Sequence, residues 1–246
     1  MLRDKVILIT GASRGIGAAT ARICAENHAR VIINYNRSSE KAEEIRKDLT
    51  EEGYDVALFK ADVSREEEVK ALYDFVRKEY GKIDVLINNA GIMINNLIMM
   101  TKTEEFDKIV DINCKGVFLC TRFFSKLMMK KKSGKIINLA SIVGVYGSPG
   151  QSVYSASKSF VIGFSKASAK ELGNYGITVN AVAPGFVDTE LNIVWDDITR
   201  DQVQTTIALK RLGQPEDIAR VILFLCSNLS DYVSGQVIGV DGCQRM

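Results

Sequence analysis

A tyrosine and a lysine one helical turn apart, Tyr154 and Lys158, are the side chains best spaced for chemistry, and Ser141 lies thirteen residues before the tyrosine. On a helix, residues i and i+4 share a face, with Cβ atoms roughly 5–6 Å apart. Tyrosine ordinarily has a pKa near 10, and a cation at about 4 Å stabilises its phenolate by about 4 kcal/mol, which is about 3 pKa units. The spacing therefore predicts that Lys158 makes Tyr154 a usable acid near neutral pH.

One such pair is weak evidence, because an exposed amphipathic helix carries the same spacing as an ordinary surface contact. The start of the chain adds a second signal. Gly11, Gly15 and Gly17 follow a β-branched run at 6–10 and precede an alanine-rich pattern that continues to about His28. A strand, a glycine turn and a helix N-terminus present backbone N–H groups to a phosphate, so this region predicts a dinucleotide site.

The end of the second predicted strand, 31–34, indicates which dinucleotide binds. Asn36 and Arg37 follow it, and no Asp or Glu occurs between positions 31 and 39. In dinucleotide folds an acidic residue here binds the ribose 2′-hydroxyl and selects NAD. Arg37 and Arg14 would instead suit a 2′-phosphate, so we expect NADP(H) to be favoured over NAD(H). The alternative is that Arg37 is only a solvated loop charge.

The elements that must position these residues alternate along the chain. Further strands are predicted at 56–60, 85–88, 135–139, 178–182 and 236–240, and further helices at 39–52, 65–80, 103–132, 151–172 and 215–227. This alternation predicts an α/β protein, a single-domain Rossmann-type doubly wound sheet with about seven parallel strands and helices on both faces. We expect one dinucleotide-binding and catalytic domain over 1–246, with a substrate lid at about 186–213, where periodicity is lost.

Composition excludes several classes of function. A net charge of +2 argues against nucleic-acid binding, and no apolar run approaches the roughly 20 residues that span a membrane. The N-terminus is too short and charged for a signal peptide, and five scattered cysteines are typical of reduced thiols, so we expect a cytoplasmic protein. The chain has a single histidine, His28, which a Ser-His-Asp hydrolase would have to use. A zinc-dependent alcohol dehydrogenase would lack its usual ligand set, and we expect no metal.

In combination and order, these motifs resemble the short-chain dehydrogenase/reductase family over the whole chain. The resemblance is carried by Thr10-Gly-x-x-x-Gly-x-Gly17, Asp62, Asn88-Asn-Ala-Gly91, Asn113, Ser141, Tyr154-x-x-x-Lys158 and Pro184-Gly185. Within the family the chain is most similar to bacterial 3-oxoacyl-(acyl-carrier-protein) reductases, through Gly150-Gln151, the run from Gly176 to Gly185 and the run from Ser234 to Gly242.

The resemblance implies a role for each motif. Tyr154 would protonate a carbonyl oxygen that Ser141 holds, Lys158 would lower the tyrosine pKa and bind the nicotinamide ribose, and Asn113 would support a water-linked proton path. Asp62 and Val63 would hold the adenine, and Val187 and Thr189 would meet the carboxamide. The implied cofactor-binding residues are Gly11, Ser13, Arg14, Gly15, Ile16, Gly17, Asn36, Arg37, Asp62, Val63, Asn89, Ala90, Gly91, Tyr154, Lys158, Pro184, Gly185, Val187 and Thr189.

The resemblance further implies NADPH-dependent reduction of a carbonyl to a secondary alcohol, with a 3-oxoacyl thioester of acyl carrier protein or a small molecule as substrate, by a homotetramer. Tyr175 stands where an arginine for carrier docking is expected, and Cys243 replaces an expected second glycine. These departures leave open a reductase or dehydrogenase of another secondary alcohol or ketone, such as a sugar or steroid. A nucleotide-binding regulator without activity is a further alternative.

Overall fold

Seven parallel strands form a single sheet in the computed structural model, which describes residues 1–189 and 197–245. The strand order is β3-β2-β1-β4-β5-β6-β7, so the chain changes direction across the sheet between β1 and β4. The carboxyl ends of strands on either side of such a switch point form a crevice for ligands. The strands are β1 (Val6–Ile9), β2 (Arg30–Tyr35), β3 (Val56–Lys60), β4 (Val85–Asn88), β5 (Gly134–Leu139), β6 (Ile177–Pro184) and β7 (Val237–Val240).

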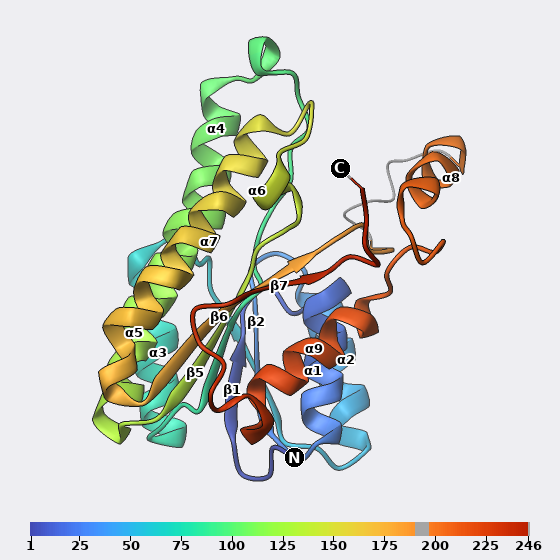
Figure 1. The fold of residues 1–246 in the computed structure, drawn as a ribbon. Helices are drawn as coiled ribbons and strands as arrows, with labels where there is room; N and C mark the ends of the chain where they lie inside the picture. Colours follow the sequence, from blue (N-terminus) through green and yellow to red (C-terminus); the bar gives the residue numbers. More distant parts are fainter. Residues whose placement is uncertain (190–196, 246) are drawn as a thin grey trace.

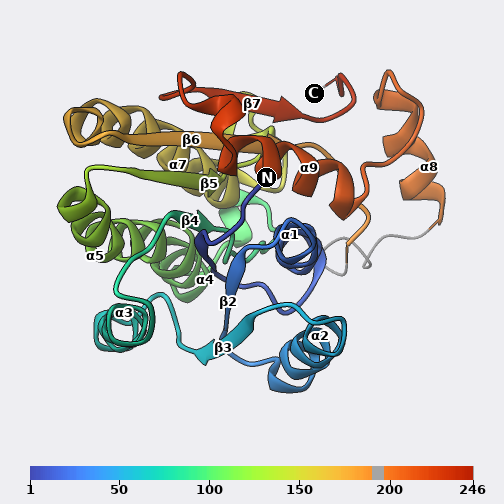
Figure 2. The ribbon, with the colours of Figure 1, turned by 90° about the horizontal axis from the view of Figure 1, so that it is seen from below.

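Helices cover both faces of this sheet (Figure 1). One face carries α1 (Gly15–Glu26), α2 (Ser39–Glu51) and α9 (Pro215–Cys226), and the other carries α3 (Glu66–Tyr80), α4 (Thr103–Val110), α5 (Gly116–Lys131) and α7 (Ser152–Leu172). Figure 2 shows the two layers on opposite sides of the strands. The predicted doubly wound α/β fold is therefore confirmed.

The strand sequences explain why both faces need helices. In β1, Ile7 and Ile9 pack in the apolar cluster beneath α1 and α9, whereas Val6 and Leu8 pack in the cluster of the α3 and α5 layer. All four side chains are fully buried. Burial of each such side chain contributes about 1.5–3 kcal/mol. Parallel strands buried on two faces appear in the sequence as continuous apolar runs, and this is why they were predictable.

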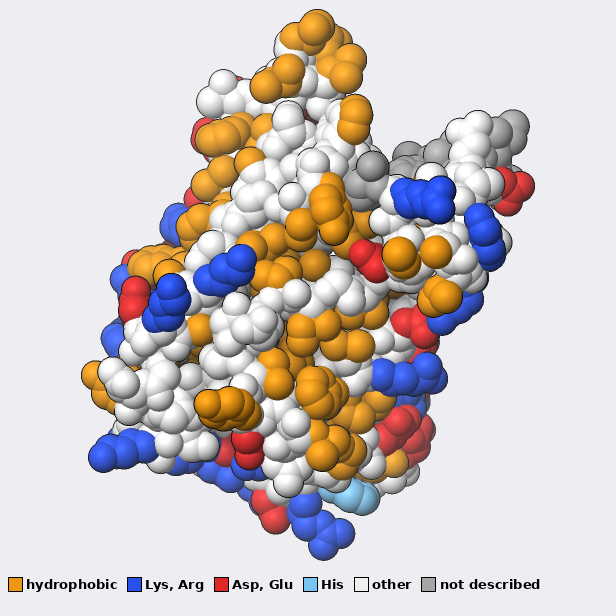
Figure 3. Space-filling view, in the orientation of Figure 1, with side chains coloured by type: hydrophobic (Ala, Val, Ile, Leu, Met, Phe, Trp, Pro, Cys, Tyr) orange, Lys and Arg blue, Asp and Glu red, His pale blue; other side chains and the backbone are white. Residues whose placement is uncertain are grey.

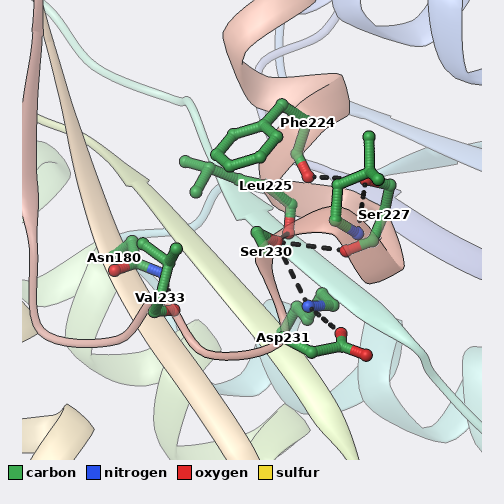
Figure 4. Close-up of polar contacts among 9 residues, drawn as sticks. Asn180, Phe224, Leu225, Ser227, Ser230, Asp231 and Val233 are labelled. Atoms are coloured by element: carbon green, nitrogen blue, oxygen red, sulfur yellow. Dashed lines mark hydrogen bonds and ion pairs between the residues drawn. The ribbon is translucent and has the colours of Figure 1, made fainter.

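The link between α9 and β7 fixes the last strand through buried polar contacts (Figure 4). Ser230 Oγ donates to the Leu225 carbonyl at 2.9 Å, and Ser227 Oγ donates to the Phe224 carbonyl at 2.8 Å. Asn180 on β6 donates to the carbonyl of Val233 at 2.8 Å, which joins the link to the neighbouring strand. These contacts position β7 and the C-terminal residues that follow it beside the end of β6.

Two predicted segments differ from the structure. The expected helix at 103–132 contains a π-helical turn, Asp111–Lys115, between α4 and α5. The predicted lid at 186–213 contains a helix, α8 (Asp197–Thr206), that its weak periodicity did not predict. Residues 190–196 of that predicted lid lie outside the described residues.

Several exposed hydrophobic side chains lie together at one tip of the molecule. Hydrophobic side chains gather there in Figure 3, above α4, where the chain forms the 3₁₀ turn Ile98–Met100. Ile98 and Met99 are 74% and 84% exposed. Cys243 is exposed, and the other four cysteines are buried. Over the described ranges, the helices include none of the length and hydrophobicity that a membrane span requires.

Candidate active site

A pocket of about 400 Å³ opens at the carboxyl ends of the strands, at the switch point between β1 and β4. Its volume falls in the range of roughly 300–1,000 Å³ usual for small-molecule sites. Every residue predicted to bind the cofactor lines it except Gly17. The pocket therefore brings together residues from the first glycine turn to Thr189, across most of the chain.

The glycine turn packs tightly against the loop after β4. Gly11 has a φ of +63°, and a Cβ there would lie 2.7 Å from Ala90 Cα. Thr10 Oγ1 accepts hydrogen bonds from the backbone N–H groups of Asn89 and Ala90, both at 3.0 Å, and Asn89 Nδ2 donates to the Gly11 carbonyl at 2.9 Å. Gly17 lies behind this turn, where a Cβ would be 2.8 Å from Ala12 Cα. Gly17 therefore allows the turn to pack closely and does not line the pocket.

The N-terminus of α1 suits an anionic group. The helix begins at Gly15 in the pocket wall and carries no acidic residue in its first turn, and no side chain of the described residues caps it. Helix N-termini with open N–H groups bind phosphates through hydrogen bonds and the helix dipole. The residues present therefore fit the pyrophosphate of a dinucleotide.

The far end of the pocket combines one carboxylate with two arginines. Asp62 accepts hydrogen bonds from Asn36 Nδ2 at 2.9 Å and from the Ser64 hydroxyl at 2.6 Å. Burial raises the pKa of Asp62, but these hydrogen bonds outweigh it, so the pKa lies below its ordinary value and the carboxyl is ionised. Arg14 and Arg37 also line the pocket, and Arg37 is exposed. No acidic residue takes the place at the end of β2 that would select a 2′-hydroxyl.

Ser141, Tyr154 and Lys158 meet on the opposite wall. Tyr154 lies in the first turn of α7 and Lys158 one turn later, on an unbroken helix. A Cβ at Gly144, in α6 (Val143–Tyr146), would lie 2.7 Å from the Lys158 backbone, so α6 packs directly on α7. This contact brings the segment after β5 close to the tyrosine, whose pKa the Ser141 side chain lowers.

Burial shifts the pKa values of the two ionisable side chains of this wall in opposite directions. Burial raises the pKa of Tyr154 to about 12, although the hydrogen bond with Ser141 lowers it in part. Burial lowers the pKa of Lys158 to about 8. Lys158 Nζ lies 5.7 Å from the centre of the Tyr154 ring and donates to the Leu139 carbonyl at 2.7 Å. Burial is thus the largest influence on the pKa of both side chains, and the expectation that Lys158 makes Tyr154 a usable acid near neutral pH stays a prediction.

Tyr154 lines the pocket and keeps part of its surface exposed. At neutral pH its phenol is protonated, as a proton donor must be before it acts, and a raised pKa makes it a weaker acid.

Asn113 lies behind the pocket wall and does not line it. Its side-chain nitrogen donates to the Ile92 carbonyl at 2.9 Å and to Ser157 Oγ at 3.0 Å, and its oxygen accepts from the Ile92 N–H at 2.9 Å. Asn113 is buried and belongs to the π-helical turn Asp111–Lys115. Asn113 therefore links the loop after β4 to α7, and a Cβ at Gly91 would lie 3.3 Å from its oxygen and 3.5 Å from Lys158 Nζ.

The pocket also contains residues that the sequence did not predict, among them Met93 and Gln151. Gln151 Nε2 donates to Asn95 Oδ1 at 2.9 Å and lies 3.2 Å from Met93 Sδ. Gln151 immediately precedes α7, three residues before Tyr154. Its place directly before the helix that carries Tyr154 could have indicated that it lies near the tyrosine.

Comparisons with known proteins extend over the whole of this site. A family profile described as Enoyl-(Acyl carrier protein) reductase matches residues 11–243. The chain is 45% identical over 246 residues to the 3-oxoacyl-(acyl-carrier-protein) reductase FabG of Staphylococcus aureus, a match that covers 100% of both chains. It is 43% identical to 3-oxoacyl-(acyl-carrier-protein) reductases of Synechocystis sp. and Thermotoga maritima, over 98% of this chain and 97% and 98% of theirs.

Proposed function

Because this chain belongs to the short-chain dehydrogenase/reductase family, we propose that it reduces the 3-oxo group of an acyl thioester of acyl carrier protein to a 3-hydroxyl group, with NADPH as the reductant. The names of the full-length relatives support this substrate. The observation that carries the reaction type is the placement of Ser141, Tyr154 and Lys158 in one wall of a pocket whose other wall is the glycine turn.

Residues along the pocket would hold the cofactor from end to end. The N-terminus of α1 would bind the pyrophosphate, Asp62 and Val63 the adenine, and Arg14 and Arg37 the 2′-phosphate that distinguishes NADP from NAD. Lys158 would bind the nicotinamide ribose. When bound, NADPH supplies the hydride for the carbonyl carbon.

The protein's own part in the reaction is to orient the carbonyl and to supply a proton. The Ser141 hydroxyl donates a hydrogen bond to the carbonyl oxygen and holds it beside Tyr154. The phenol, protonated at neutral pH, gives its proton to the oxygen as negative charge develops there. The phenolate that remains is stabilised by the Lys158 ammonium one turn along the helix. Asn113 bonds to the Ile92 backbone and to Ser157 on α7, and so holds the loop after β4 in place beside the helix that carries Tyr154 and Lys158.

A substrate panel tests the proposal. Purified enzyme would be assayed with acetoacetyl thioesters of acyl carrier protein and N-acetylcysteamine, with a crotonyl thioester, and with small ketones, each with NADPH and NADH. We expect the acetoacetyl thioesters and NADPH to give the highest kcat/KM. Activity on small ketones without activity on the acetoacetyl thioesters would support reduction of another ketone instead. Preference for the crotonyl thioester would indicate reduction of a carbon–carbon double bond, which the description of the family profile names.

A further inference from the structure

A polar clamp, formed by Asn95 and Asn96 with Gly150 and Gln151, joins the loop after β4 to the start of α7, on the wall that holds Tyr154. The Gln151 side chain is 7% exposed and lines the pocket, and its Nε2 donates to Asn95 Oδ1 at 2.9 Å. The neighbouring backbone repeats the link, because the Asn96 N–H donates to the Gly150 carbonyl at 2.8 Å. The two loops are therefore held together by a side chain and by the main chain.

The contacts of Gln151 fix which end of its amide faces the clamp. Met93 Sδ, 3.2 Å from the amide nitrogen, and Asn95 Oδ1 are both acceptors, so both favour nitrogen at this place. The Oε1 atom accepts no hydrogen bond from any residue of the described ranges. Three buried side-chain atoms of the described residues have no hydrogen-bond partner, namely Asn88 Oδ1, Arg122 Nε and Ser155 Oγ. Gln151 Oε1 is not one of them, so it is not fully buried. The Gln151 oxygen therefore keeps contact with solvent.

This open acceptor lies close to the reacting centre. Gln151 directly precedes α7, Tyr154 lies in the first turn of that helix, and both line the pocket. The Ser155 N–H donates to the Gln151 carbonyl at 2.7 Å, which ties the Gln151 backbone to the first turn of α7. A ligand bound at Tyr154 thus has the Gln151 oxygen as a hydrogen-bond acceptor in the same pocket.

We infer that Gln151 is a specificity-determining residue whose Oε1 accepts a hydrogen bond from an N–H group on the arm that carries the oxoacyl group. Asn95 and Met93 are positioning residues that hold the amide in this orientation. The inference rests on the proposed function, since a thioester of the pantetheine arm has amide N–H groups beyond its sulfur. A site with an oriented acceptor discriminates against a substrate that lacks the donor.

Two thioesters of similar length isolate this hydrogen bond. Acetoacetyl-N-acetylcysteamine has an amide N–H, and S-butyl acetothioacetate does not, whereas the reacting oxoacyl groups are identical. The measurement is the ratio of their kcat/KM values. Gln151→Leu should lower this ratio by about 3- to 10-fold, which corresponds to one neutral hydrogen bond, and leave the Kd for NADPH unchanged.

Variants of the clamp distinguish positioning from a structural role. Asn95→Ala should also lower the ratio, because the Gln151 amide is then free to turn. Asn95→Asp keeps an acceptor for Gln151 Nε2 and should preserve the ratio. Gln236→Leu is a matched control, because Gln236 is exposed and its side chain donates only to the Ser234 carbonyl among the described residues.

Several results would overturn the inference. An active Gln151→Leu enzyme with an unchanged ratio refutes it and leaves the proposed function intact. A wild-type enzyme that reduces neither thioester overturns both proposals. If Gln151→Leu does not fold, Asn95→Ala decides by the same ratio, and an unchanged value there also refutes the inference.

Discussion

Lys158 is a buried cation whose replacement should separate stability from activity. Its side chain is 6% exposed, and its Nζ donates to the Leu139 carbonyl at 2.7 Å. Burial lowers its pKa from 10.5 to about 8, so the folded protein loses free energy when this lysine is charged. Lys158→Met retains an unbranched side chain and removes the charge. The variant should lose activity because the phenolate loses its cation.

The magnitude follows from the pKa values. The difference between 10.5 and about 8 corresponds to about 3 kcal/mol, at roughly 1.4 kcal/mol per unit. Lys158→Met also leaves the Leu139 carbonyl without this donor, which costs about 1–3 kcal/mol. The two effects oppose each other, so we expect a net change at pH 7 between about zero and 2 kcal/mol of added stability. Only the charge effect depends on pH.

The direction of that pH dependence is fixed by the order of the pKa values. Between about pH 8 and 10.5 the unfolded chain binds more protons at this site than the folded chain, so wild-type stability gains from rising pH. The cost of the charge is present in full below this window and absent above it. The free energy of unfolding of wild type minus that of Lys158→Met should therefore increase by about 3 kcal/mol from pH 7.5 to 10.5.

Urea denaturation at a series of pH values measures this difference. Because the same carboxyl, tyrosine and thiol groups titrate in both proteins, their contributions largely cancel in the subtraction. Lys166→Met is the control, since Lys166 lies exposed on the same helix. Stability profiles for wild type and Lys158→Met that stay parallel across the window would refute the argument, because they would show that burial does not shift this lysine.

Other predictions concern the cofactor and the packing of the glycine turn. Arg37→Ala should lower the ratio of kcat/KM for NADPH to that for NADH by about tenfold, as measured by steady-state kinetics, and exposed Lys47→Ala should not. Gly17→Ala should destabilise the protein by about 1–3 kcal/mol in urea, because its Cβ would lie 2.8 Å from backbone atoms. Gly163→Ala, in an open position on α7, should be neutral or stabilising, and equal effects would contradict this account.

The layers of the fold were predictable because local sequence determines them. Apolar runs such as Val6–Ile9 are continuous where a parallel strand is covered on both faces, and each is followed by a helical pattern. Gly11 could be recognised because it lies between the first strand and the first helix. The order of β1 and β4, and hence the place of the crevice, then followed from the rules of the fold class.

The rest depended on contacts between distant residues. The π-helical turn at Asp111–Lys115 arises where Asn113 bonds to Ile92 and Ser157, which no local pattern shows. The Asn95–Gln151 bond joins positions 56 residues apart. The raised pKa of Tyr154 depends on burial in the folded protein, whereas the sequence showed only that a lysine is near. Residue spacing thus identified the chemical groups but not their solvation.

The most direct test of the account is the reduction of an acetoacetyl thioester by Tyr154→Phe, which removes one oxygen and little else. We predict that turnover falls by at least about a hundredfold, the scale of general acid catalysis, while the Kd for NADPH measured by fluorescence titration stays within about twofold of wild type. A variant that binds NADPH and reduces the thioester at the wild-type rate would contradict the assignment of the proton donor.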